Sequence, residues 1–550
     1  MKKQILLSAF LVAASYAVAC TNFIVGKKAS ADGSVFCTYN ADSYGAFMPL
    51  YHFPAGKHAP GEMRQIYDWD TNKYLGQIPE AAETWNVIGN TNEWQLTIGE
   101  TTFGGREEMV DTTGIIDYGS LIYITLQRAK NAREAIQVMT TLVEQYGYCS
   151  EGETFSICDP NEAWIMEMMG CASDRKLSKE RTVWVALRIP DDMICAHANQ
   201  SRIRQFDMKD KQNVLFSKNV VKYARKMGWF SGKDEAFSYA DAYCPADFGA
   251  RRWCEARVWS FFNRFSDDFS AYLPWALGED PNAQPMPLWI KPNKLLTLQD
   301  MQAAMRDHFE GTPLSLDQDL GGGIWEMPYR VSPLSYKVDG EQYFNERPTS
   351  TQQSAFSFIS QMRSWLPRQV GGCFWFGNDD GNMVSYVPIY CANTRQPVCF
   401  NTPGADDIHF SMDNAFWVCN WVANMVYPRY SLMFPSLKQV RDSLDAAFAR
   451  AQPEIEAEAI ARYANDEQAL AAHMTDYSCL KAEQMMDRWR QLAYFLIVKY
   501  NDMVERPDRD GQFYYNVNGL GQTIKRPGMP ERFAREMNRH GGQRMKMPKK

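Results

Sequence analysis

The chain of 550 residues is long enough for one large domain or for several ordinary ones, and 45% of its residues are hydrophobic. Its formal net charge of −7 argues against nucleic acid or an anionic membrane surface as a partner. The end of the chain is a local exception, because basic residues recur from Arg532 to Lys550. We interpret residues 507–550 as a basic, solvated and partly disordered tail.

The first 19 residues have the three parts of a secretory signal peptide. Two lysines follow the initial methionine, an apolar run extends from Ile5 to about Ala14, and small residues stand at Ala17 and Ala19. The apolar run is shorter than the roughly 20 residues that a membrane-spanning helix needs. The sequence therefore predicts export to the periplasm or beyond, cleavage before Cys20, and a mature chain without a transmembrane segment.

A second interpretation of the same residues is a bacterial lipoprotein signal, in which lipid is attached to the thiol of Cys20. That signal prefers a large aliphatic residue three positions before the cysteine, where this chain has Ala17. The two interpretations exclude each other, because an acylated thiol with a blocked amine cannot catalyse.

A β-hairpin is predicted directly after the cleavage site. Residues 21–26 have strand character, Asp32-Gly33 is a strong turn signal, and residues 34–40 return as a second strand. Paired residues of an antiparallel hairpin have a constant sum of positions. A turn centred near residues 31–32 therefore places Cys20 opposite residues 42–43 and brings the Asp42 carboxylate to the new N-terminus.

The pattern that follows predicts an α+β fold built on antiparallel sheets. Residues 44–84 are expected to form an irregular loop over the site, and residues 85–100 a strand, a tight turn and a strand. Helical periodicity covers residues 117–146 in two pieces. Strands are expected at 153–158, 163–169, 183–189 and 193–199. Strands, two helices and further strands favour a layered antiparallel sandwich over a parallel βαβ fold.

In the second half of the chain, helices are expected at 217–228, 250–265 and 297–308, the last with Thr297 and Asp300 placed for an N-terminal cap. The proline-rich residues 274–292 are interpreted as an internal linker or a long loop. Strands are expected at 355–360, 372–376 and 384–390. Residues 436–505 are helical in pattern, with a break at Pro453.

Familiar catalytic and cofactor motifs are missing from the sequence, and neither a metal site nor a cofactor is predicted. Of the seven histidines, His197 and His308 stand out, and for both we favour a structural role. The 13 cysteines include no C-x-x-C pair, and most are interpreted as small buried hydrophobic residues.

An N-terminal cysteine can act without a catalytic histidine. The unperturbed pKa of a thiol is about 8.5 and that of an α-amine about 7.7–8.0, so the amine of the same residue can accept the thiol proton. The thiolate then attacks a carbonyl to form a thioester, which water hydrolyses. The oxyanion that develops needs fixed hydrogen-bond donors, commonly an Asn side chain and a backbone N–H.

Several stretches resemble the bacterial dipeptidase family typified by dipeptidase A. They are the opening Cys20-Thr-Asn-Phe-Ile-Val-Gly-Lys-Lys-Ala-Ser-Ala-Asp-Gly-Ser34, Asn92-Glu93, and the segments 152–157, 196–203 and 356–366. The resemblance covers most of residues 20–430. That family belongs to the N-terminal-nucleophile (Ntn) hydrolases and is related to penicillin V acylases and bile salt hydrolases. The resemblance implies an αββα sandwich, two antiparallel sheets between helical layers, with added helices at the C-terminal end.

The resemblance also implies roles for individual residues. Cys20 would be nucleophile and base, and Asp42 would hold its amine. Asn199 would donate to the oxyanion from its side chain and Asn92 from its backbone. Arg257 would be the arginine of the site.

Three further positions bear on these roles. Arg251 and Arg252 compete with Arg257 for the place of the site arginine. Relatives often have Arg-Asn-x-Asp where this chain has Tyr39-Asn40-Ala41-Asp42, so substrate preference or thiolate stabilisation is expected to differ.

The sequence thus predicts an exported cysteine-type dipeptidase that hydrolyses small peptides with a free N-terminus. Alternatives are an amidase or acylase acting on a non-peptide amide, and a surface lipoprotein that binds peptides or glycans without catalysis. The expected organisation is a signal peptide at 1–19, the hydrolase domain at 20–430, a helical extension at 431–506 packed on it, and the basic tail. A homo-oligomer is compatible with these features.

Overall fold

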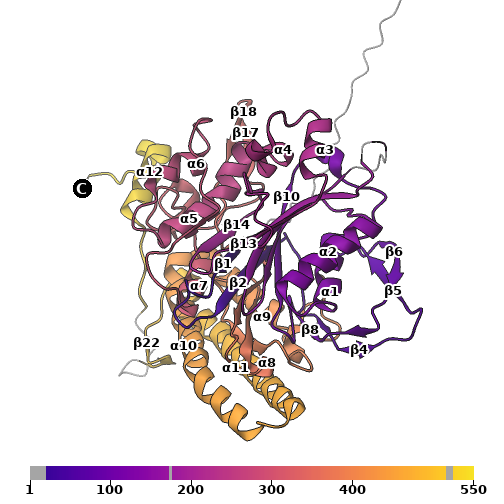
Figure 1. The fold of residues 1–550 in the computed structure, drawn as a ribbon. Helices are drawn as coiled ribbons and strands as arrows, with labels where there is room; N and C mark the ends of the chain where they lie inside the picture. The colour runs from indigo at the N-terminus through magenta and orange to yellow at the C-terminus, as the bar shows by residue number, and fades with distance from the viewer. Residues whose placement is uncertain (1–19, 172–175, 177, 516–523, 550) are drawn as a thin grey trace, which may run out of the picture.

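Several strands of the chain are buried along their whole length, including β2 (Val35–Asp42), β11 (Gly152–Cys158) and β19 (Ser354–Met362). A strand buried on both faces needs a covering layer on each side of its sheet. The computed structural model, which describes residues 20–171, 176, 178–515 and 524–549, meets this need with two stacked antiparallel sheets between helices (Figure 1). The predicted αββα sandwich is confirmed, and the predicted signal peptide lies outside the described residues.

The first sheet has seven strands in the order β16-β14-β1-β2-β19-β20-β21, and all of its pairs are antiparallel. Its other strands are β1 (Asn22–Val25), β14 (Ile194–His197), β16 (Trp289–Ile290), β20 (Gly372–Asn378) and β21 (Val387–Tyr390). The proline-rich segment 274–292 begins within α6 (Leu273–Leu277) and contains β16, and because β16 pairs with β14 the segment is part of this domain and not a linker between domains.

The second sheet has eight strands in the order β15-β13-β12-β11-β10-β9-β8-β3, again antiparallel throughout. Its other strands are β3 (His52–Phe53), β8 (Val87–Ile88), β9 (Thr91–Asn92), β10 (Thr97–Gly104), β12 (Ala163–Gly170), β13 (Thr182–Ile189) and β15 (Val214–Phe216). Strands β1 and β2 of the first sheet pack against β10 and β11 of the second, so the two sheets meet at these four strands.

Helices cover the outer faces. The two helices predicted for residues 117–146 are α1 (Tyr118–Leu126) and α2 (Ala132–Tyr146), which pack on β10, β11 and β13. The first sheet is covered by α5 (Ala256–Arg264), α7 (Leu298–Met305), α9 (Ala415–Val426), α10 (Tyr430–Arg462) and α11 (Glu467–Tyr500). The shorter helices are α3 (Val220–Lys226), α4 (Tyr239–Tyr243), α6 (Leu273–Leu277) and α8 (Arg368–Gly371). Helix α7 begins with the predicted cap, in which Thr297 and Asp300 bond each other's backbone N–H.

The segment expected to be an irregular loop after Asp42 contains short paired strands. They are β4 (Gly56–Lys57) with β7 (Glu83–Thr84), and β5 (Met63–Tyr67) with β6 (Tyr74–Pro79). Further hairpins are β17 (Ser335–Val338) with β18 (Glu341–Phe344), and β22 (Asp508–Arg509) with β23 (Gln512–Phe513). Within the basic tail, α12 (Glu531–Gly541) is held by Arg532, which donates to the Asp317 carbonyl at 2.6 Å.

The predicted break at Pro453 is wrong, because α10 continues through this residue. A proline in a helix interior costs about 3 kcal/mol or more. Buried ion pairs hold the helix on both sides of it: Asp445 pairs with Arg306 at 2.7 Å and Glu456 pairs with Arg363 at 2.7 Å. Tertiary contacts therefore outweigh the local preference, and the helical region is interrupted only between α10 and α11. Among the described residues, no helix is long and apolar enough to span a membrane.

The pair between Arg363 and Glu456 joins the first sheet to α10 through two hydrogen bonds of 2.7 Å, and Tyr390 donates a third to Glu456 at 2.7 Å. Breaking a buried ion pair costs about 3–5 kcal/mol, because it leaves an uncompensated charge. We expect Glu456→Gln to lower the free energy of unfolding by about this amount, measured by urea denaturation followed by circular dichroism.

The matched control is Asp476→Asn, which removes the partner of Arg395 from a pair whose side chains are 72% and 54% exposed. An exposed pair is worth about 0–1 kcal/mol, so this variant should unfold almost like the parent protein. Equal losses in the two variants would contradict a role for the buried pair in attaching α10.

Candidate active site

The thiol of Cys20 lies where the two sheets meet. Cys20 stands two residues before the start of β1 and is fully buried. Its Sγ is 3.2 Å from the hydroxyl of Tyr39, on β2 of the first sheet, and 3.6 Å from Oε1 of Glu100, on β10 of the second. One residue from each sheet thus contacts the sulfur, and the tyrosine hydroxyl also donates to Glu100 Oε1.

The hairpin that carries Cys20 is present, but its register differs from the prediction. Thr21 pairs with Asn40 and Ile24 with Cys37, so Cys20 lies opposite residue 41 and not opposite 42–43. The predicted turn residues lie in the second half of a longer connection, where Asp32 accepts a hydrogen bond from the Ser34 N–H at 3.0 Å. The predicted centre of the turn was therefore about one residue too late.

Asp42 is nevertheless close to Cys20, because its backbone hydrogen-bonds the sulfur. The Asp42 carboxylate is itself fully buried and is held by Arg347 Nη2 at 2.9 Å and by the Ser354 hydroxyl at 2.6 Å. Burial raises the pKa of this carboxyl to about 7, although the positive charge of Arg347 opposes the shift. The hairpin thus brings the Asp42 backbone beside Cys20, and two donors hold the Asp42 carboxylate in place. That this carboxylate holds the Cys20 amine stays a prediction.

Burial also has the largest effect on the protonation state of the Cys20 thiol. It raises the pKa of Cys20 well above its usual value, and the nearby Glu100 and Asp42 carboxylates raise it further. The contact with the Tyr39 hydroxyl and the hydrogen bond from the Asp42 backbone N–H lower the pKa of Cys20 but do not cancel these effects. The thiol is therefore protonated at neutral pH and needs a proton acceptor beside it before it can attack a substrate.

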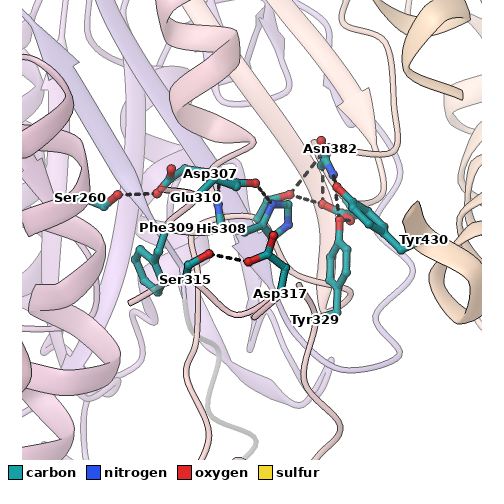
Figure 2. A network of polar contacts seen from close by, with 12 residues as sticks. Ser260, Asp307, His308, Phe309, Glu310, Ser315, Asp317, Tyr329, Asn382 and Tyr430 are labelled. Atoms are coloured by element: carbon teal, nitrogen blue, oxygen red, sulfur yellow. Dashed lines mark hydrogen bonds and ion pairs between the residues drawn. The ribbon is translucent and has the colours of Figure 1, made fainter. Parts of the chain in front are cut away.

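The two histidines singled out in the sequence serve structural roles. His197 lies between the hydroxyls of Thr101 and Ser156, at 2.7 Å from each, and burial lowers its pKa to about 3, so the ring is neutral. His308 belongs to a second buried polar network, in which its ring bonds Glu310 at 3.0 Å and packs against Tyr329 (Figure 2).

The second network joins the end of α7 to the C-terminal helices. Asp307 accepts from Ser260 at 2.6 Å on one side, and on the other Asn382 donates to the Tyr430 hydroxyl of α10 at 3.0 Å (Figure 2). These contacts attach the helical layer to the sandwich.

Arg257 reaches Cys20 from the helical side. It is fully buried on α5, directly after a π-helical turn at Ala250–Glu255, and π-helical turns often occur at functional sites. Its Nη1 donates to the Cys20 carbonyl and to the Thr21 hydroxyl, each at 2.7 Å. Its Nη2 donates to the Ala198 carbonyl at 3.1 Å and to Asn199 Oδ1 at 2.9 Å. One guanidinium thus fixes the start of β1 relative to the end of β14.

The competing arginines lie elsewhere. Arg251 stacks on the Trp275 ring at 4.0 Å, and Arg252 pairs with Glu346. Of the three candidates, the structure places Arg257 against Cys20. Burial lowers the pKa of Arg257 to about 10, which still leaves it charged at neutral pH.

Asn199 is joined to Cys20 through Arg257. It follows β14 with a φ of 63°, in the left-handed region that non-glycine residues adopt at a cost, often at functional sites. Arg257 bonds its Oδ1, and its Nδ2 donates to the Thr102 carbonyl at 2.7 Å. The amide is therefore oriented from both ends, with its donor directed toward β10.

Asn92 makes its hydrogen bonds away from Cys20. Its Nδ2 donates to the carbonyls of Leu126 and Ala129 at the end of α1, at 2.7 and 2.8 Å. Its backbone N–H, the predicted oxyanion donor, bonds the Leu96 carbonyl at 3.0 Å. Asn90, two residues earlier, instead lines a pocket together with Tyr39 and Glu100.

The sequence analysis missed Glu100 and its neighbour Glu153. Glu100 is a carboxylate within a buried eight-residue strand, Thr97–Gly104, and Glu153 occurs in the equally buried β11. Buried carboxylates are rare unless they are paired. Two glutamates within strands whose other residues indicate a buried core could therefore have been recognised in the sequence as candidate site residues. Tyr39 was recognisable from the sequence, because it occupies a position at which relatives often have arginine.

Comparison with known proteins gives the family. Residues 19–61 and 51–443 match the profile described as Peptidase family C69. The chain belongs to peptidase family C69. It is therefore a peptidase, a hydrolase of peptide bonds.

Three curated bacterial relatives agree with the family assignment. A protein of Salmonella dublin named "Probable dipeptidase" is 24% identical over 71% of this chain and 85% of its own length. A "Probable dipeptidase" of Latilactobacillus sakei is 24% identical over 75% and 82%. "Dipeptidase A" of Lactobacillus helveticus is 23% identical over 74% and 81%.

Replacing Arg257 tests whether the hydrogen bonds of its two terminal nitrogens position Cys20. Lysine keeps the charge but cannot reproduce the planar fork that bonds Cys20, Thr21, Ala198 and Asn199 together. We expect Arg257→Lys to lower kcat/KM for peptide hydrolysis by about 100-fold, since a small misplacement of reacting groups has an effect of this order.

Arg251→Lys is the matched control, because Arg251 lies on the same segment but stacks on Trp275. This variant should stay within about threefold of the parent enzyme, as expected for a contact outside the site. Similar activity of both variants would show that hydrolysis does not depend on the contacts between Arg257 and Cys20.

Proposed function

We propose that this peptidase is an exported cysteine-type dipeptidase that hydrolyses small peptides with a free N-terminus through a thioester on Cys20. The observation that carries the proposal is the fully buried Cys20 thiol between Tyr39 and Glu100, with Arg257 on its carbonyl, in a chain of family C69. The names of the curated relatives support dipeptides as the substrate class.

Removal of the leader before Cys20 would release its α-amine beside the thiol. The amine accepts the thiol proton, and the thiolate attacks the peptide carbonyl carbon. As the C–N bond breaks, the Cys20 ammonium returns the proton to the leaving amine, and a thioester remains. A water molecule, deprotonated by the same amine, then attacks the thioester, releasing the acid and the thiol. The buried Asp42 carboxylate, fixed by Arg347 and Ser354, supports the role of holding the amine.

The oxyanion of each step needs a donor that is already oriented. We assign this role to Asn199, because Arg257 fixes its Oδ1 and leaves Nδ2 as the end that can bond a substrate. In the substrate-free protein Nδ2 bonds the Thr102 carbonyl, so the substrate oxygen would compete for this donor. Asn92 does not enter this scheme, since Leu96 already accepts its backbone N–H.

Export follows from the predicted signal peptide and the cleavage before Cys20. The contrary hypothesis is that Cys20 carries a lipid. Cys20 could then not catalyse, because its thiol would be acylated and its amine blocked. An amidase or acylase would share the same nucleophile, so a substrate panel separates it from a dipeptidase.

The nucleophile is tested by expressing the whole chain and determining the intact mass and N-terminal sequence of the exported product. We expect a mature chain that starts with an unmodified Cys20 and cleaves dipeptides, and a Cys20→Ser variant that loses at least about 1,000-fold of this activity because the hydroxyl is far less nucleophilic. Cys479→Ser, at a partly exposed position on α11, should leave the activity unchanged.

A diacylglycerol on Cys20 would contradict the proposed enzyme, as would full activity in the Cys20→Ser variant. Hydrolysis of penicillin V or a bile salt conjugate, but of no dipeptide, would support the acylase alternative instead.

The role of the α-amine is tested by a chain in which one added methionine replaces the leader before Cys20. Its thiol is unchanged, but the amine is converted into an amide that cannot accept a proton. We expect kcat to fall by about 100- to 10,000-fold, the usual contribution of a general base. The same chain, with the methionine removed by an aminopeptidase, should recover full activity. An active methionine-extended chain would exclude the amine as base.

A further inference from the structure

A narrow pocket is lined by Tyr39 and Glu100, the two residues that contact the buried Cys20 thiol, and the rest of its lining is unusual in composition. Aromatic side chains dominate it, namely Tyr39, Trp69, Tyr118, Tyr123 and Phe356, and among the described residues that line it Glu100 is the one that carries a charge. Trp69 comes from the segment after Asp42 and stacks on Tyr123, with ring centroids 4.6 Å apart. The predicted excursion over the site therefore supplies part of the wall.

Glu100 is the negative member of a buried pair of carboxyl groups. Its side chain hydrogen-bonds that of Glu153, which requires one proton between them. Burial and the neighbouring charge raise the pKa of Glu153 well above its usual value. Burial raises the pKa of Glu100 as well, but that of Glu153 further, so of the two carboxyls Glu153 holds the shared proton and Glu100 carries the negative charge. Nearby Asp70, which accepts from Tyr118 at 2.8 Å, adds to the negative potential and raises the pKa of Glu100.

A buried carboxylate without a cation is costly, because few solvent dipoles stabilise it. The groups that bond Glu100, namely Tyr39, Cys20 and Glu153, are all neutral in the substrate-free protein. An aromatic pocket with one uncompensated carboxylate is suited to a small organic cation, since aromatic faces and a carboxylate both attract an ammonium group.

The position of Glu100 relative to the nucleophile identifies which cation it would meet. Glu100 Oε1 lies 3.6 Å from Cys20 Sγ. In a peptide whose first carbonyl is attacked by this sulfur, the α-nitrogen lies about 2.5 Å from the carbonyl carbon, as backbone bond lengths and angles dictate. An ammonium at that nitrogen is therefore within reach of the carboxylate. When the thiol proton moves to the Cys20 amine, Oε1 also loses the hydrogen bond from Sγ and gains a free acceptor position.

From these observations we infer that Glu100 binds the α-ammonium group of the substrate and selects peptides with a free N-terminus. The inference rests on the proposed function for the identity of the substrate, but the ammonium site itself does not depend on hydrolysis. Glu100 is then a specificity-determining residue, and Tyr39 positions it by donating to Oε1. This also gives a role to the tyrosine found where relatives often have arginine.

Binding to a Cys20→Ala chain that starts at residue 20 tests the ammonium site without chemistry. The probes are alanyl-alanine and leucyl-leucine, each compared with its desamino analogue (propionyl-alanine and 4-methylpentanoyl-leucine), by calorimetry at pH 7.5. We expect each dipeptide to bind at least about 30-fold more tightly than its analogue, the order of effect of a buried charge pair. Adding Glu100→Gln should reduce this preference to less than about threefold.

Glu153→Gln is the matched control. The amide can donate to Glu100 as the protonated carboxyl does, so the preference for the free amine should persist. Equal binding of dipeptides and desamino analogues by the Cys20→Ala protein would overturn the inference, and so would undetectable binding of both dipeptides. An equal loss for both probe types in Glu100→Gln would also overturn it, because Glu100 would then shape the pocket without recognising the ammonium.

Hydrolysis by the parent enzyme separates this inference from the proposed function. If the parent enzyme prefers substrates with a free amine, and Glu100→Gln removes that preference mainly by raising KM, the inference and the proposed function both stand. If the parent cleaves neither dipeptide while the Cys20→Ala protein keeps its preference for the ammonium, the proposed function fails and the ammonium site stands. If the parent cleaves dipeptides and desamino analogues equally well, the inference fails and the peptidase assignment stands.

Discussion

The burial of Cys20 at the junction of the two sheets is the constraint on which the rest of the site depends. Tyr39 reaches the sulfur from one sheet and Glu100 from the other, while Arg257 bonds the carbonyl of the same residue from the helical layer. These three contacts exist together only when the sandwich is fully packed. The site is thus a product of the tertiary fold and not of any local segment, which explains why it is assembled from strands far apart in sequence.

Burial of so many ionisable groups in one region is unfavourable unless their charges compensate one another. Asp42 is paired with Arg347, and the Arg257 guanidinium lies near both Asp42 and Cys20. Glu100 and Glu153 instead share a proton. The positive charges of Arg257 and Arg347 are therefore concentrated around the backbone of Cys20 and the Asp42 carboxylate. The negative charge of Glu100 faces the pocket. Such a division suits a reaction in which an oxyanion forms on one side of the thiol and an ammonium binds on the other.

The local parts of the site could be predicted from the sequence. The hairpin brings Asp42 to Cys20 because a turn signal separates two strand patterns, and the capped helix at Thr297 follows from its side chains alone. The register was misjudged because Asp32 lies beside the centre of a longer connection. The break at Pro453 was misjudged because tertiary ion pairs oppose a local preference.

The long-range parts could not be predicted in this way. Arg257 was correctly placed near Cys20 only through the family resemblance, since Arg251 and Arg252 have the same chemistry and differ in their tertiary surroundings. The meeting of Glu100 with Cys20 depends on how one sheet is stacked on the other, for which the sequence carries no periodic signal. For the same reason the hydrogen bonds of Asn92 to the end of α1 could not be predicted.

The central claim is that the thiol of Cys20 becomes acylated during peptide hydrolysis. The most direct test is to mix the mature enzyme with excess dipeptide, quench it with acid within milliseconds, and locate any added mass by peptide mapping. The account predicts an acyl group equal to the first residue of the dipeptide on the N-terminal peptide, attached at Cys20 and removed by hydroxylamine. An acyl group on another residue, or turnover without any acylated enzyme under conditions that favour its accumulation, would contradict it.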